Sequence, residues 1–388
     1  MNQIVDRLWV LRREPEGPLA PYLDAFAQSL DEQGFKRHLI GRQIRVAANF
    51  SHWLQAKEVA VQDVTDEHVR RFSEEVARKQ SIRRGELASL RRLMELLCRL
   101  GIIQLSPEQH GLSPIERTVK AFATYLREEL TLCDKTLIQY CPFIEQFLSD
   151  CFGDGPVELA ALRAEDVIGF VQQQATHLSP TRAKSATTAL RSFLRYLRYC
   201  GEIRLNLAAA VPTVPNWSMT GIPRAIAPEH LQAALAHCPR DTPVGRRDYA
   251  ILMLLARLGL RAGEIVSLTL DSIDWEEGSI AVLGKGNQAT SLPMPTEVGE
   301  AIADYLRHGR PTNSSRVLFL RVCAPIRGLG AAQTISSIVV AAIKRADIET
   351  LHRGSHQFRH ALAADMLRHG ATLTEIGSLL RHRHAKTT

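Results

Sequence analysis

The sequence has 388 residues, with 48 Lys and Arg against 41 Asp and Glu, and its pI is about 9.1. This length suggests two or three domains, and 45% apolar with 23% charged residues excludes a globally disordered chain. No apolar run approaches the length of a membrane span, and the first residues lack the apolar core of a secretion signal. We therefore expect a cytoplasmic protein, neither secreted nor embedded in a membrane.

The seven cysteines are scattered and include no CxxC pair, which predicts reduced thiols and no cysteine-based zinc site. They are Cys98, Cys133, Cys141, Cys151, Cys200, Cys238 and Cys323. The net charge of +7 is modest for this length and favours a nucleic-acid partner only slightly. The position of the positive charge along the chain is therefore more informative than its total.

Two stretches rich in Pro and Gly, 106–114 and 211–223, cannot continue a helix and predict linkers. We expect an N-terminal helical domain at 1–105, a second helical domain at 113–210, a linker at 211–223 and a larger domain at 224–388. Apolar residues recur at helical spacing in both of the first two blocks, for example at Leu190, Phe193, Leu194 and Leu197.

The first two blocks also resemble each other. Phe26, Ala27 and Leu30 match Phe122, Ala123 and Leu126 at an offset of 96, and later matches follow at offsets of 98 and 100. Leu90, Leu93, Met94, Leu97 and Gly101 pair in this way with Leu190, Phe193, Leu194, Leu197 and Gly201. We interpret this as a duplicated helical domain. The alternative is a chance alignment of two amphipathic domains of similar length.

The last block combines helices with a small hairpin. Two short apolar runs, 279–283 and 290–294, flank the turn segment Gly284-Lys285-Gly286-Asn287 and predict two antiparallel strands. We expect helices over 228–236, 246–259, 296–307, 334–346, 359–369 and 372–380. The predicted fold class is mainly α with a small β-sheet.

Basic residues gather on one helix of the second block. Lys184, Arg191, Arg195 and Arg198 fall close together on a face other than the apolar stripe. Such a face suits a nucleic-acid backbone, where Lys and Arg displace counterions, although a solvated helix face is the alternative. The matching helix of the first block carries Arg83, Arg84, Arg91, Arg92 and Arg99.

The last 38 residues hold six of the 14 histidines: His352, His356, His360, His369, His382 and His384. His356 and His360 have the i, i+4 spacing of zinc helices, but no HExxH arrangement accompanies them. Structural or solvated histidines are a second alternative. Because Arg, Lys and His lie together here, we favour phosphate chemistry without a metal.

Three short motifs in the last block resemble those of the tyrosine recombinase (phage integrase) family. They are Arg261-Ala262-Gly263-Glu264, His356-Gln357-Phe358-Arg359-His360, and Leu380-Arg381-His382, the last with Arg381 where the family usually has Gly. Lys285 matches the basic residue of the family's hairpin. The resemblance covers about residues 113–388 and leaves 1–105 outside the usual two-domain pattern, as a possible additional clamp.

The resemblance implies two helical-bundle, SAM-like DNA-clamping domains followed by an α+β catalytic domain. It implies catalysis by Arg261, Lys285, His356, Arg359 and His382, with Glu264 in support and Lys184, Arg191, Arg195 and Arg198 binding DNA. In the family a tyrosine hydroxyl attacks a DNA phosphodiester, with no metal or other cofactor. The implied partner is double-stranded DNA with inverted repeats, bound by a homo-tetramer, which suggests a nucleoid-associated protein.

The nucleophilic tyrosine of the family would fall at position 391, beyond Thr388, so we expect the chain as given to be inactive. A clipped chain, a truncated gene and a natural non-catalytic relative are the three explanations, and truncation is the one we favour. Three functions stay open: a recombinase once the C-terminus is restored, a non-catalytic DNA-binding protein, and a metal-dependent phosphodiesterase.

Overall fold

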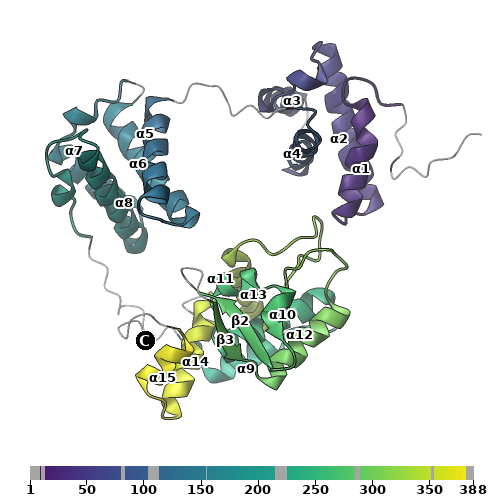
Figure 1. The fold of residues 1–388 in the computed structure, drawn as a ribbon, viewed down its shortest axis with the longest axis vertical. Coiled ribbons are helices and arrows are strands. Elements are labelled where there is room, and N and C mark those ends of the chain that lie inside the picture. Colours follow the sequence, from purple (N-terminus) through teal and green to yellow (C-terminus); the bar gives the residue numbers. More distant parts are fainter. Residues whose placement is uncertain are drawn as a thin grey trace, which may run out of the picture. The chain divides into compact units, whose positions relative to one another are not determined.

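The computed structural model describes residues 9, 14–79, 84–103, 113–153, 155–214, 225–284, 289–350 and 354–381 (Figure 1). The chain divides into two compact units, one made of 1–105 with 222–388 and the other of 106–221. Three hydrophobic cores that share no residue lie in 9–103, 115–214 and 226–361. Each of the three regions is described by itself below.

The first region is a helical bundle. Its helices are α1 (Leu23–Glu32), α2 (Arg37–Ala56), α3 (Asp66–Lys79) and α4 (Arg84–Arg99), with a short 3-10 turn at Val61–Asp63. Phe26 and Phe50 are buried in its core, and the Phe50 ring lies 5.1 Å from that of Phe72. The apolar face of each helix therefore points inward, as its spacing predicts.

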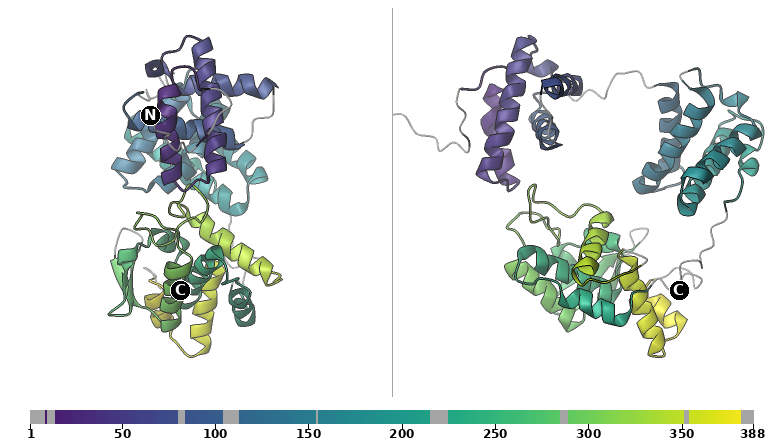
Figure 2. Two further views of the ribbon diagram at one scale, coloured as in Figure 1. Left: turned by 90° about the vertical axis from the view of Figure 1, so that its right-hand side faces the viewer. Right: turned by 180° about the vertical axis from the view of Figure 1, so that it is seen from behind.

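The second region has the same succession of elements. Its helices are α5 (Pro114–Glu128), α6 (Asp134–Phe152), α7 (Ala164–His177) and α8 (Pro180–Tyr199), with a 3-10 turn at Leu159–Ala161. Figure 2 shows both bundles from two further sides. Val211, which the sequence analysis places at the start of a linker, is buried in this core.

The two bundles match in detail. Phe147 and Phe170 pair at 5.2 Å, as Phe50 and Phe72 do in the first bundle. Both fourth helices end on a glycine with positive φ, +70° at Gly101 and +79° at Gly201. The two bundles thus repeat a core ring pair and a glycine cap, and a duplicated domain remains our interpretation.

The third region joins helices to a small sheet. Strands β1 (Ile273–Asp274), β2 (Ser279–Leu283) and β3 (Ala289–Pro293) form an antiparallel sheet in the order β1-β2-β3. The helices are α9 (Pro228–Ala236), α10 (Pro243–Leu258), α11 (Ala262–Ser267), α12 (Thr296–His308), α13 (Ala332–Arg345), α14 (His356–Arg368) and α15 (Leu373–Leu379). The prediction of a mainly α chain with a small β-sheet is confirmed, and β1 is a third strand that the sequence did not predict.

Helix α10 is the centre of this region. Most of its residues are buried, and it packs against α12 on one side and α14 on another. Its end brings the candidate site together, because Gly259 turns the chain with a φ of +55°. A Cβ on Gly259 would lie 2.7 Å from the Leu380 side chain and 3.0 Å from that of Leu362. Glycine at this position therefore lets α14 and the end of α15 pack closely against the end of α10. None of the described helices is long and apolar enough to cross a membrane.

Candidate active site

Arg261 lies directly after the turn at Gly259 and is the N-cap residue of α11. Its backbone N–H donates to one carboxylate oxygen of Glu264 at 2.8 Å, and its guanidinium donates to the other at 2.7 Å. The Arg261 side chain keeps 36% of its surface exposed, whereas Glu264 keeps 5%. The buried carboxylate therefore fixes an arginine whose guanidinium still reaches solvent.

Arg359 lies on α14, one turn after His356, and is buried. Its guanidinium donates to two backbone carbonyls, those of Gly259 and Leu380. These carbonyls end α10 and α15, so Arg359 connects the three helices that surround the site. Burial, and then the nearby charges of Arg261 and Arg381, lower the pKa of Arg359 to about 10.

Arg381 adds a third guanidinium that sequence reasoning did not assign to the site. It donates to Glu264 at 2.8 Å, and its own carbonyl accepts from Arg261 at 3.3 Å. Its φ of +54° lies in the left-handed region that favours glycine, which agrees with the glycine usual in the family at this position. The presence of an arginine at position 381, where the family usually has glycine, is the feature of the sequence that could have identified this residue.

Glu264 is the shared anion of the cluster. Burial alone would raise the pKa of its carboxyl, but the backbone N–H and guanidinium of Arg261, together with Arg381, outweigh burial and lower this pKa. The carboxylate is therefore ionised at neutral pH and offsets part of the charge of three arginines. The cluster carries a net positive charge and suits an anion such as a phosphodiester.

The other predicted catalytic residues are placed less completely. His356 is the first residue of α14, and its ring lies 6.4 Å from that of His360. Lys285 belongs to the segment 285–288 between β2 and β3, and His382 follows Arg381; both lie outside the described residues. The structure thus brings together Arg261, Glu264 and Arg359. Within the described ranges, no three His, Cys, Asp or Glu side chains gather as a metal site would require.

Comparisons with known proteins identify the family of this chain. The profile of the phage integrase family matches residues 224–388. The protein named "Putative integrase/recombinase y4rA" of Sinorhizobium fredii (strain NBRC 101917 / NGR234) is 46% identical over 389 residues, covering 100% of this chain and 94% of that relative. The chain belongs to the phage integrase family. The resemblance in the sequence motifs to tyrosine recombinases is thereby confirmed.

Two further matches cover more of this family member than the family profile does. "Tyrosine recombinase XerC" of Staphylococcus haemolyticus (strain JCSC1435) is 28% identical over 258 residues, which cover 65% of this chain and 81% of XerC. The structure of XerH recombinase bound to palindromic difH substrate covers 72% of this chain and 93% of XerH, with a TM-score of 0.55 and 15% identity. The latter match shows the shared fold.

The predicted basic face of this integrase lies on α8. Lys184, Arg195 and Arg198 are exposed there. Arg191 differs, because its guanidinium donates to the backbone carbonyls of Val211 at 2.9 Å and Pro212 at 3.0 Å. It holds the segment that leaves the bundle against α8, a structural role that the sequence pattern did not suggest.

Proposed function

We propose that this integrase is a site-specific recombinase that cuts and rejoins duplex DNA through a 3′-phosphotyrosine. The observation that carries the proposal is the pair of guanidinium groups, Arg261 and Arg359, held at the meeting point of α10, α14 and α15. Fixed guanidinium groups stabilise charge that develops on a phosphorane, because they need no reorganisation during the reaction. The family membership of the chain supports the same chemistry.

In the proposed reaction the tyrosine oxygen attacks the phosphorus, and the bond from phosphorus to the 5′-oxygen breaks. Arg261 and Arg359 each bind a non-bridging oxygen, and His382 hydrogen-bonds the phosphate. Lys285 gives its proton to the leaving 5′-oxygen, while His356 accepts the proton of the tyrosine. The phosphodiester becomes a phosphotyrosine ester, so the bond energy is retained and no ATP is required.

The proposed partner is double-stranded DNA with inverted-repeat sites, bound by four protomers. The exposed cations of α8, Lys184, Arg195 and Arg198, would contact phosphates. The relative XerH has been captured on its palindromic difH substrate in a post-cleavage complex, which supports a DNA partner for this chain. Arg191 would act indirectly, by holding the chain segment after α8.

The test is covalent capture on a nicked suicide duplex that carries the recombination site. The protein for this test is extended beyond residue 388 to include a tyrosine at position 391, the place that corresponds to the tyrosine of the family. We expect an SDS-stable protein–DNA adduct that Arg261→Ala and Arg359→Ala both abolish. Arg257→Ala is the matched control, because Arg257 lies near the end of α10 but pairs with Glu297 at 2.6 Å, outside the cluster.

Two outcomes would contradict the proposal. Specific binding without any adduct would favour a non-catalytic DNA-binding protein derived from a recombinase. Adduct-free cleavage that a chelator abolishes would favour a metal-dependent phosphodiesterase.

A further inference from the structure

Helix α2 of the first bundle presents a polar stripe along its outer face. His38, Arg42, Arg45, Asn49 and His52 are all exposed and follow each other at spacings of four, three, four and three residues. Residues with this spacing lie on one face of a helix. From residue 38 to residue 52 the stripe is about 21 Å long, at a rise of 1.5 Å per residue. We call these five residues the α2 stripe.

Helix α2 contains no Asp or Glu, although it is 20 residues long. The corresponding face of α6, at an offset of 97, carries Lys135, Gln139, Pro142, Gln146 and Ser149, which are also exposed. That helix contains three acids, Asp134, Glu145 and Asp150. The two bundles thus share their buried positions, while the exposed face of α2 has become basic and that of α6 has not.

The helix that the sequence pattern singled out in this bundle, α4, uses its arginines differently. Arg92 donates to Gln43 at 2.9 Å and its guanidinium lies 5.0 Å from the centre of the Phe35 ring. Arg99 donates to the hydroxyl of Ser29 at 3.2 Å. Both arginines therefore make contacts within the bundle, whereas Arg91 of the same helix is exposed.

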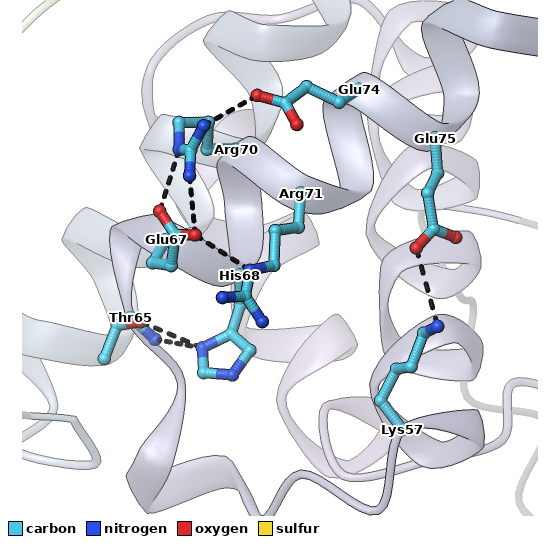
Figure 3. A network of polar contacts seen from close by, with 8 residues as sticks. All are labelled: Lys57, Thr65, Glu67, His68, Arg70, Arg71, Glu74 and Glu75. Carbon is cyan, nitrogen blue, oxygen red and sulfur yellow. Dashed lines mark hydrogen bonds and ion pairs between the residues drawn. The ribbon is translucent and has the colours of Figure 1, made fainter.

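Two arginines of helix α3 are paired with carboxylates of the same helix, unlike most of the α2 stripe (Figure 3). Arg70 and Arg71 both donate to the carboxylate of Glu67, and Arg70 also reaches Glu74 at 2.8 Å. Arg42 of the α2 stripe has a weaker carboxylate neighbour, Glu86, at 3.9 Å. Arg70 and Arg71 are thus neutralised locally, whereas within the α2 stripe only Arg42 has an ion-pair partner among the ion pairs of the described residues.

We propose that the α2 stripe is a DNA-binding surface, which makes residues 14–103 an additional clamp on duplex DNA. Its arginines suit phosphates, and Asn49 and the two histidines can hydrogen-bond phosphate oxygens or base edges. Duplex DNA carries about one negative charge per 1.7 Å of axis, which gives a stripe of this length many phosphates to meet. The inference rests on the proposed function, since it assumes that DNA is the partner.

The test measures binding of the full chain to a 40-bp fluorescent duplex by anisotropy, over a series of salt concentrations. Each lost phosphate contact lowers the slope of log K against log salt by about 0.9. We expect Arg42→Ala/Arg45→Ala to lower the slope by about 1.8 and to weaken binding at least roughly tenfold at low salt. Arg70→Ala/Arg71→Ala removes the same formal charge from the same bundle and should leave the slope unchanged.

A second pair, Arg195→Ala/Arg198→Ala on α8, separates the two proposals. If the α8 variant weakens binding while the α2 variant behaves like the Arg70→Ala/Arg71→Ala control, the α2 stripe is not a DNA surface and the proposed function stands. If the wild-type chain binds no duplex at all, both proposals are wrong. Hydrogen exchange of α2 and α4 in each variant verifies that the bundle is folded.

Discussion

Two carboxylates in this chain each hold two arginines, in opposite surroundings. Glu264 binds Arg261 and Arg381 and its side chain is 5% exposed, whereas Glu67 binds Arg70 and Arg71 on α3 and its side chain is 29% exposed (Figure 3). The guanidinium groups of Arg261 and Arg381 are both held by the buried carboxylate of Glu264. Those near Glu67 keep alternative partners in water, so the same pairing has little structural consequence there.

The difference shows what burial adds to an ion pair. At Glu67 the hydrogen bonds from Arg70 and Arg71 are the largest influences on the carboxyl, and they lower its pKa to about 2. At Glu264 desolvation opposes the same kind of bonds, and the pKa of the carboxyl is still lowered because the backbone and guanidinium of Arg261, together with Arg381, outweigh it. Removing either the buried carboxylate or one of its arginine partners should therefore lower the stability of the fold, because the group that remains is buried without its counter-charge.

The largest expected effect comes from removing each carboxylate in turn. Glu264→Ala leaves Arg261, Arg359 and Arg381 close together without their anion, and we expect a loss of about 3–5 kcal/mol in unfolding free energy. Glu67→Ala should cost much less stability, because the ion pairs of Glu67 with Arg70 and Arg71 are exposed to water. Urea denaturation with hydrogen exchange in α10, α14 and α3 measures both. Equal effects of the two substitutions would mean that the Glu264 cluster is not held as a buried unit.

A smaller effect is expected at Arg381. Arg381→Gly relieves the positive φ but removes a partner of Glu264, while Arg261 remains. We expect a net loss of about 2 kcal/mol, since breaking the buried pair costs more than the left-handed conformation of a non-glycine residue. Arg381→Met keeps the strained backbone and should lose more than Arg381→Gly. A glycine variant more stable than the wild type would show that backbone strain dominates over the pair.

The sequence predicted part of this cluster and missed part of it. Arg261, Glu264 and Arg359 belong to motifs of adjacent residues, so short spacings were enough to nominate them. The contact between Glu264 and Arg381 joins residues 117 positions apart, and it depends on how α15 ends against the turn at Gly259. No local pattern encodes such a contact.

The same limit applied to other parts of the fold. Helical periodicity, together with start and stop residues, predicted α9 and the approximate bounds of α12 to α15. Strand β1 has only two residues, too few for any alternation to be recognised. The tie from Arg191 to the carbonyls of Val211 and Pro212 was equally hidden, since it depends on the path of the chain after α8.

The smallest expected effect is on the loss of folding stability at low pH. Glu264 and Glu67 both contribute to it, and high salt distinguishes their contributions. The pKa of both carboxyls is lowered in the folded chain, so each contributes stability that is present above the ordinary pKa of 4.5 and is lost as pH falls through the folded value. Glu264→Gln and Glu67→Gln should therefore each make stability less dependent on pH below about 4.5.

Raising NaCl to 1 M shortens the Debye length to about 3 Å, which screens exposed pairs much more than buried ones. In 1 M NaCl we expect Glu67→Gln no longer to change how folding stability depends on pH below about 4.5. We expect the effect of Glu264→Gln to persist. The measurement is the urea midpoint between pH 3 and pH 6 at low and high salt. Loss of both effects in 1 M NaCl would mean that water and ions reach Glu264, and that the arginine cluster is open to solvent before any phosphate binds.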